Sequence, residues 1–170
     1  MIVGQTVKIE LGEAIACHEA AIHLIKSANY TPDMAKRYNK NLTFHEYVAE
    51  YAETVSAELV VAKYLNLPFD PFESKFKIKA DVGDIFEVKW THWDDGNLIV
   101  HEYDRNSDIA ILVTGKYPFY RIAGWIPVAI AKRDRYRHHS QPNWWIAQHH
   151  LMPIDTLIRS NYGADLPRLP

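Results

Sequence analysis

Hydrophobic positions that recur at three- and four-residue steps predict a first helix over residues 12–28. The apolar positions Ile15, Ile22 and Ile25 follow this spacing, which places them on one face of a helix. A short alternating segment at residues 6–11 precedes this helix and reads as a strand. Residues 29–42 contain Pro32 and several asparagines, and we expect a loop there with one helical turn after the proline.

A second helix is predicted over residues 44–65. Thr43 and Glu46 form a capping box ahead of an apolar run, which is a typical helix start. The prolines of the segment 66–72 end the helix. Within it, most glutamates, such as Glu46 and Glu53, fall on one polar face.

The chain then changes to short segments rich in β-branched and aromatic residues, bounded by Asp, Asn and Gly. We expect strands in residues 75–80, 84–91, 97–103, 108–115, 120–131 and 144–148. The turn sequence Asp-Asp-Gly-Asn at 94–97 predicts an antiparallel hairpin between residues 85–92 and 97–103. The strand at 108–115 is apolar on both faces and should be central.

The order of these elements predicts an α+β (α/β) fold in one domain, residues 1–170. Two helices come first, a run of strands follows, and a closing helix begins near Pro153 and covers about residues 153–160. Helices should therefore pack on a central mixed, mostly antiparallel sheet.

Composition narrows the class of protein. The 170 residues are 48% hydrophobic and 24% charged, as in ordinary globular proteins. No apolar run approaches the ~20 residues of a membrane helix, and no secretory signal is visible. Cys17 is the only cysteine, which excludes an internal disulfide and fits a cytoplasmic protein. The net charge of -2 does not by itself indicate a nucleic-acid binder.

An acid and a lysine stand close together in the strand at 84–91. Side chains alternate between the faces of a strand, so Phe86 and Val88 should enter the core while Glu87 and Lys89 share the other face. Along the strand these two residues lie roughly 7 Å apart. Asp81 and Asp84 stand just before the strand, and either could join Glu87 in holding Mg²⁺ or Mn²⁺ through oxygen atoms. A solvated strand face is the alternative explanation.

Glu58 strengthens the case for a site. It lies in the apolar row of the second helix with Tyr47, Tyr51 and Val61. A carboxylate on a core-facing row costs free energy unless a partner satisfies it. A metal ion, Lys89 or a bound water would supply that partner. The alternative explanations are a structural Lys or Arg as partner, or a position at the margin of the apolar row.

These residues resemble the PD-(D/E)XK nuclease superfamily. The resemblance covers about residues 44–115 and is carried by Glu58, Asp81, Glu87 and Lys89. It implies a restriction-endonuclease-like core at about residues 44–130. Where members often have proline before the aspartate, this chain has Ala80. The segment 124–126 is also similar to small phage proteins, which would place the protein in the host cytoplasm.

The resemblance implies metal-dependent hydrolysis of nucleic acid, DNA more than RNA. Asp81 and Glu87 would hold the metal, with Asp84 competing for the same role. Lys89 would steady the attacking water or the developing charge, and Glu58 would orient water. A homodimer is compatible with this class. The alternative is a nuclease-fold protein that has lost catalysis and serves as an interaction module for nucleic acid or protein.

A basic segment offers a nucleic-acid surface. Residues 132–139 contain the candidates for gripping a phosphate backbone and, in one tyrosine, for stacking on a base: Lys132, Arg133, Arg135, Tyr136 and Arg137. Residues 35–40 form a second basic and aromatic loop. The pairs His138–His139 and His149–His150 do not predict zinc, because adjacent histidines rarely face one ion.

Overall fold

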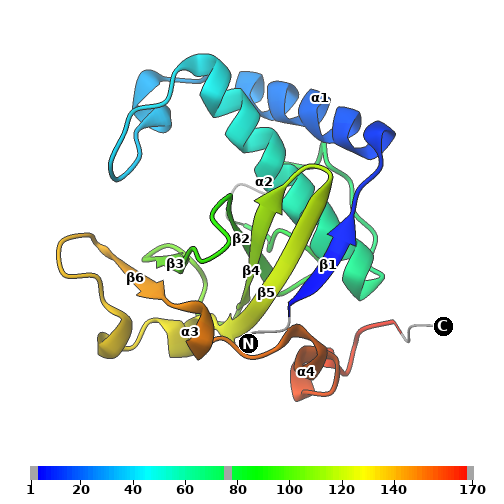
Figure 1. Ribbon diagram of the computed structural model, residues 1–170, viewed down its shortest axis with the longest axis vertical. Helices are drawn as coiled ribbons and strands as arrows, with labels where there is room; N and C mark the ends of the chain where they lie inside the picture. Colours follow the sequence, from blue (N-terminus) through cyan, green and yellow to red (C-terminus); the bar gives the residue numbers. More distant parts are fainter. Residues whose placement is uncertain (1–3, 75–77, 168–170) are drawn as a thin grey trace.

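The computed structural model describes residues 4–74 and 78–167 (Figure 1). Its helices and strands are β1 (Gln5–Lys8), α1 (Leu11–Ser27), α2 (Phe44–Leu65), β2 (Phe86–Thr91), β3 (Leu98–His101), β4 (Ile109–Lys116), β5 (Phe119–Pro127), α3 (Val128–Ala131), β6 (Asn143–Ile146) and α4 (Ile154–Ile158). Short 3-10 turns lie at Pro32–Ala35, Asp134–Tyr136, Gln148–His150 and Asn161–Gly163. The predicted α+β class is confirmed. No helix within the described ranges is long and apolar enough to cross a membrane.

The boundaries of α2 follow the capping chemistry of its ends. The Thr43 side chain accepts a hydrogen bond from the Glu46 backbone N–H at 3.3 Å, and Glu46 Oε2 accepts one from the Thr43 N–H at 2.7 Å. At the other end Asn66 adopts a left-handed conformation, which stops the helix. The predicted helix over 44–65 is therefore confirmed.

The main sheet has four strands in the order β1-β5-β4-β2. Strand β4 is central, as predicted, and pairs in parallel with β2 and antiparallel with β5. Strand β3 forms a separate two-stranded ribbon with β6. The predicted hairpin between 85–92 and 97–103 is therefore wrong. The chain does turn at 94–97, but β3 leaves the plane of β2 and buries its apolar side chains against β6.

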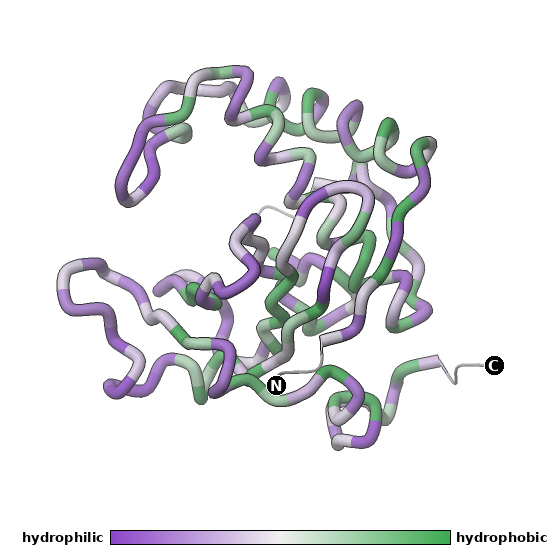
Figure 2. The backbone as a smooth tube through the Cα atoms, viewed as in Figure 1, coloured by the Kyte–Doolittle hydropathy of each residue, from purple (hydrophilic) through white to green (hydrophobic). Residues whose placement is uncertain are grey.

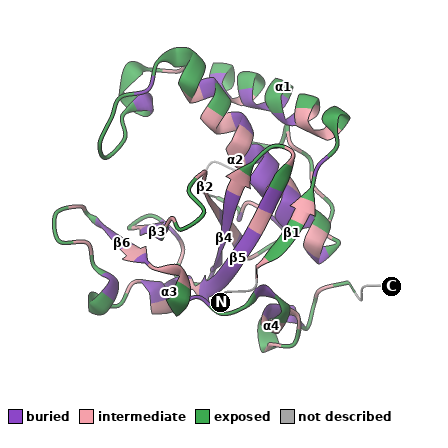
Figure 3. Ribbon diagram, viewed as in Figure 1, coloured by how far each residue is buried: buried purple, intermediate pink, exposed green. Residues whose placement is uncertain are grey.

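The two faces of the sheet carry different layers. On one face, α2 packs on Phe86 and Val88 of β2 and on alternate residues of β4. On the other face, β3 and β6 pack on Ala110 and Leu112 of β4. Helix α1 packs on the outer side of α2 (Figure 1). The buried residues accordingly concentrate in β4, β5 and the sheet-facing side of α2 (Figure 3).

Three further expectations need correction. Residues 128–131, expected to extend a strand, form the short helix α3. Glu53, assigned to the polar face of α2, accepts a hydrogen bond at 2.5 Å from the hydroxyl of the buried Tyr120. Of the strand expected at 75–80, residues 75–77 lie outside the described residues, and residues 78–80 are not a strand.

Candidate functional site

Strand β2 presents Glu87 and Lys89 on the face opposite to α2. Phe86 and Val88 are buried beneath α2, so strand alternation turns the acid and the lysine to the other side. Lys89 Nζ lies 3.0 Å from Glu87 Oε1, and the two side chains are only 15% and 19% exposed. The predicted pairing of these residues on one face is confirmed.

Asp104 completes the pairing of Lys89. It lies in the turn after β3, and its side chain is 2% exposed. Lys89 Nζ donates to Asp104 Oδ1 at 2.9 Å, and the backbone N–H of His101 donates to Oδ2 at 2.7 Å. Sequence reasoning missed Asp104 because an aspartate in the segment 102–108 reads as an ordinary turn residue.

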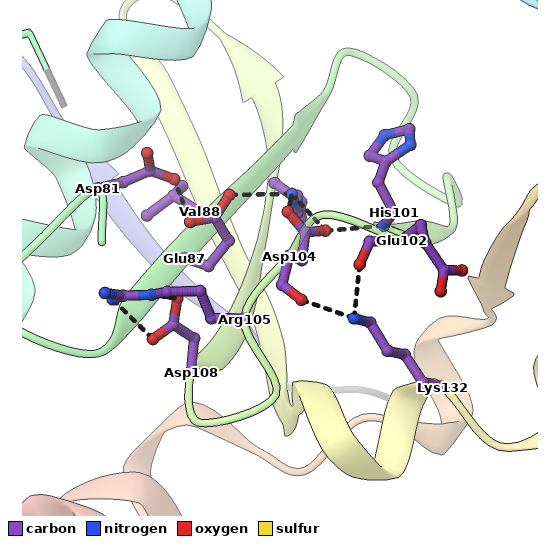
Figure 4. Close-up of polar contacts among 10 residues, drawn as sticks. Asp81, Glu87, Val88, His101, Glu102, Asp104, Arg105, Asp108 and Lys132 are labelled. Atoms are coloured by element: carbon purple, nitrogen blue, oxygen red, sulfur yellow. Dashed lines mark hydrogen bonds and ion pairs between the residues drawn. The ribbon is translucent and has the colours of Figure 1, made fainter. Parts of the chain in front are cut away.

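Asp81 lies at the edge of β2, beside the same group. Its Oδ2 accepts a hydrogen bond from the Val88 backbone N–H at 2.8 Å (Figure 4). Asp84 is exposed, and its backbone carbonyl accepts a hydrogen bond from Arg105. Of the two aspartates left open by the sequence, Asp81 is the one that shares a cavity with Glu87.

That cavity has a volume of about 50 Å³. Its lining brings together acids and bases from four segments: Lys79, Asp81, Glu87, Tyr103, Asp104, Arg105 and Asp108. A larger cleft of about 330 Å³ lies alongside and shares Lys79, Asp81 and Arg105 with it. Arg105 is fixed by Asp108, with Nη2 at 2.8 Å from Oδ1 (Figure 4). The cavity therefore adjoins a cleft large enough for part of a ligand.

Burial and neighbouring charges set the protonation of this group. Burial raises the pKa of Glu87 to about 7, and the negative charges of Asp81 and Asp104 act in the same direction against the Lys89 ammonium. Burial opposes a charge on Lys89, but the carboxylates of Glu87 and Asp104 outweigh it and raise the pKa of Lys89. Lys89 is thus a cation at neutral pH, while Glu87 can exchange a proton there.

Glu58 lies on the other side of β2, in the layer of α2. It is half-buried, and its negative charge contributes with that of Asp81 to the pKa of Tyr51, which burial chiefly raises to about 12. The same tyrosine therefore lies near both carboxylates. The described lining of the small cavity includes Asp81 but does not include Glu58.

The basic segment divides into structural and exposed residues. Lys132 Nζ donates to the backbone carbonyls of Glu102 and Asp104 at 2.9 and 2.6 Å, which fastens this segment to the site (Figure 4). Tyr136 is buried in the core beneath β6, so its ring is not available for the stacking expected of it.

The arginines of the same segment are exposed. Arg137 stacks on Trp144 at 4.5 Å from the ring centroid, and Arg135 stacks on Tyr136 at 4.6 Å. Arg133 is exposed as well. Three guanidinium groups therefore remain at the surface for a polyanion.

The donor set at the cavity suits a hard divalent cation. No group of three or more His, Cys, Asp or Glu side chains within residues 4–74 and 78–167 is arranged to hold a metal ion by itself. Mg²⁺ commonly binds through one or two carboxylates and keeps several waters, so Asp81 and Glu87 meet its minimum requirement. Burial is the main cause of the raised pKa of Glu87, and the charges of Asp81 and Asp104 add to it.

Comparison with family models, curated proteins and solved structures found no match for this chain.

Proposed function

We propose that this protein hydrolyses phosphodiester bonds of nucleic acid, DNA more than RNA, with Mg²⁺ or Mn²⁺ as cofactor. The observation that carries the proposal is that Asp81 and Glu87 line one small cavity beside a larger cleft, while Lys89 donates to Glu87 from the same strand. A restriction-endonuclease-like core around residues 44–130 is part of the same proposal. Its support is the helix α2 packed on the strand that carries Glu87 and Lys89.

Asp81 and Glu87 would hold the cation. When bound, the cation supplies charge that polarises the scissile phosphate and lowers the pKa of water. The chain prepares this position in two ways. The Val88 N–H orients Asp81, and the Lys89 ammonium orients Glu87. Arg105, held by Asp108, adds a fixed positive charge where both cavities meet.

Lys89 would stabilise negative charge and would not act as the base. Its raised pKa keeps it protonated, and its carboxylate partners fix the ammonium in place. An ammonium held in this way can donate to an oxygen on which charge develops in the transition state. Asp104 acts through Lys89 and is a positioning residue. Glu58, near Asp81 on the α2 side, would tune the charge at this edge of the sheet.

A second function is favoured by one observation. Lys89 already has two carboxylate partners, Glu87 and Asp104, so the cluster is satisfied without substrate or metal. A protein that kept this arrangement only for folding would be an interaction module that binds nucleic acid or protein. The two functions differ in whether the Asp81–Glu87 pair binds a divalent cation.

The test measures cation binding and cleavage separately. In the wild type, Mg²⁺ or Mn²⁺ at 100 times its dissociation constant should stabilise the fold by about 2.7 kcal/mol, seen as a higher Tm. Glu87→Gln should remove this shift, whereas Glu13→Gln, a change at the remote pair of Glu13 with Lys63, should keep it. Plasmid and oligonucleotide cleavage is then compared for the wild type, Glu87→Gln and Lys89→Ala. If the wild type shows neither a Tm shift with the cation nor cleavage, the proposed hydrolysis is wrong and the interaction module is the remaining function.

A further inference from the structure

Two loops that are far apart in the sequence meet above β3 and β6 through one tyrosine. The first loop closes with a bridge between Lys36 and Asn41, and the second with a bridge between Arg137 and Trp144. The ring centroid of Tyr38, near the tip of the first loop, lies 5.6 Å from that of His138 and 5.5 Å from that of Trp145. Both contacts are edge-on, and His138 itself lies against Trp145 with ring centroids 4.3 Å apart.

Both loops are held in place by their own polar contacts. Arg37 donates to Glu50 of α2 at 3.1 Å and to the Met34 carbonyl at 3.0 Å, which fixes the first loop against α2. In the second loop, His138 Nδ1 accepts hydrogen bonds from the backbone N–H groups of Ser140 and Gln141 at 3.2 and 3.1 Å. Tyr38 and His138 are therefore presented on braced turns.

Aromatic side chains also lie on the outer face of the β3–β6 ribbon, on the way to the cavity. Trp144 and Val100 point into the core, so Trp145 and His101 lie on the outer face. These two are diagonal neighbours in the register, because Ile99 pairs with Trp145 and His101 with Asn143; such neighbours lie about 7–8 Å apart.

The last ring of the series reaches the cavity itself. Tyr103 stacks on His101 with a centroid separation of 5.0 Å and an interplanar angle of 7°. Tyr103 also lines the small cavity with Glu87. We call Tyr38, Trp145, His101 and Tyr103 the aromatic track.

The two ends of the track are exposed, its middle residues Trp145 and His101 are half-buried, and positive segments lie beside it. Tyr38 is 57% exposed and Tyr103 is 55% exposed. Residues 35–40 contain three basic residues and no acidic one, and residues 132–139 contain four basic residues and one acidic. Both loops are hydrophilic along most of their length (Figure 2). Open ring faces beside cationic loops suit a ligand that is both aromatic and polyanionic.

We infer that the aromatic track binds single-stranded nucleic acid and leads it to the small cavity lined by Asp81 and Glu87. Unpaired bases stack on ring faces regardless of sequence, while the basic loops contact the phosphates. A duplex hides its base faces and gains only the phosphate contacts. The inference rests on the proposed hydrolysis for the role of the cavity, and it adds the substrate class: single-stranded DNA or RNA.

Fluorescence anisotropy tests the track without catalysis, in EDTA. Labelled oligo-dT, oligo-U and a duplex, each of about 15 nucleotides, are titrated with the wild type and with single variants. Tyr38→Ala and Tyr103→Ala should each weaken single-strand binding about 5- to 100-fold and leave duplex binding within twofold. Tyr38→Phe should bind like the wild type because the ring remains. Phe119→Ala, which removes a ring of equal exposure at the β4–β5 turn, is the matched control.

Each outcome decides one claim. Unchanged single-strand binding in Tyr38→Ala and Tyr103→Ala, or a preference for duplex, overturns the track. Loss of single-strand binding in both variants supports it, and the ratio of oligo-dT to oligo-U affinity separates DNA from RNA. If the wild type binds single strands through Tyr38 but cuts nothing with Mg²⁺ or Mn²⁺, the proposed hydrolysis is wrong and the binding role of the aromatic track stands. If the wild type cuts only duplex, the aromatic track does not guide the substrate and the proposed hydrolysis stands.

Discussion

The ammonium of Lys89 on β2 lies 2.9 Å from the carboxylate of Asp104, which follows it in the chain by fifteen residues. This contact joins the main sheet to the turn that leaves β3. With Glu87 as a second partner, it places one cation between two acids in a largely buried position. The cluster therefore contributes to the fold as well as to the candidate site.

Removing the Lys89 ammonium from this cluster should destabilise the folded protein. Lys89→Met leaves Glu87 and Asp104 buried together without a counter-charge, and the free energy of unfolding should fall by about 3–5 kcal/mol. Urea denaturation measures the loss. Lys63→Met is the matched control because Lys63 pairs with Glu13 at 2.9 Å where both side chains are about one-third exposed, and it should cost less than about 1 kcal/mol. Equal losses in the two variants would contradict a special role for the buried cluster.

The pH dependence of stability should carry the signature of Glu87. Its pKa rises from the ordinary value of 4.5 to about 7 in the folded protein, chiefly through burial. Between these values the folded state binds more protons than the unfolded state, so the free energy of unfolding falls as pH rises through this window. Above pH 7 the free energy of unfolding should be lower by up to about 3 kcal/mol because of Glu87.

Comparison with Glu87→Gln isolates this contribution. Relative to the variant, the wild type should lose stability between pH 5 and pH 8 in urea denaturation. Lys89, Lys79, Asp81 and Asp104 remain around the substituted group in both proteins. Glu13→Gln should show a constant difference from the wild type, because the pKa of Glu13 is lowered and the group stays ionised across this range. A constant difference for Glu87→Gln as well would refute the prediction.

The buried contact of Tyr120 with Glu53 should stabilise the junction of β5 and α2. Tyr120 is 1% exposed and donates to the Glu53 carboxylate at 2.5 Å. Tyr120→Phe removes a hydrogen bond to a charged group, so unfolding should require about 1.5–3 kcal/mol less. Tyr162→Phe, at a tyrosine that is 45% exposed, should stay within about 0.5 kcal/mol of the wild type in the same denaturation experiment.

The hydroxyl of Thr43 should stabilise the N-terminal end of α2. Thr43→Ala leaves the Glu46 N–H without its acceptor and should lower the free energy of unfolding by about 1 kcal/mol. Thr43→Ser keeps the oxygen and should resemble the wild type. Thermal denaturation followed by circular dichroism at 222 nm measures both. An alanine variant as stable as the serine variant would show that the cap is dispensable.

Local chemistry made part of the fold predictable from the sequence. The capping box at Thr43 and Glu46 and the prolines of segment 66–72 act within a few residues, so the bounds of α2 could be predicted directly. The all-apolar run of β4 likewise indicated a strand buried on both faces. Strand alternation was enough to bring Glu87 and Lys89 to one face.

Strand partners and the rest of the site depended on tertiary contacts. The turn at 94–97 indicated a reversal but not its direction, and β3 joined β6 because Val100 and Trp144 bury together. Asp104 gave no signal, since an aspartate in a turn normally bonds to its own backbone. Only the approach of that turn to β2 makes Asp104 a partner of Lys89.

The position of β2 at the end of the sheet order has a consequence for solubility. Its outer backbone groups would invite pairing with a strand of another molecule. Phe86 is bridged to Val82 there, and the next outward N–H, that of Val88, is occupied by the Asp81 carboxylate. The aspartate that we place at the proposed cation site therefore also covers this edge, and replacing it would leave the Val88 N–H open to a strand of another molecule.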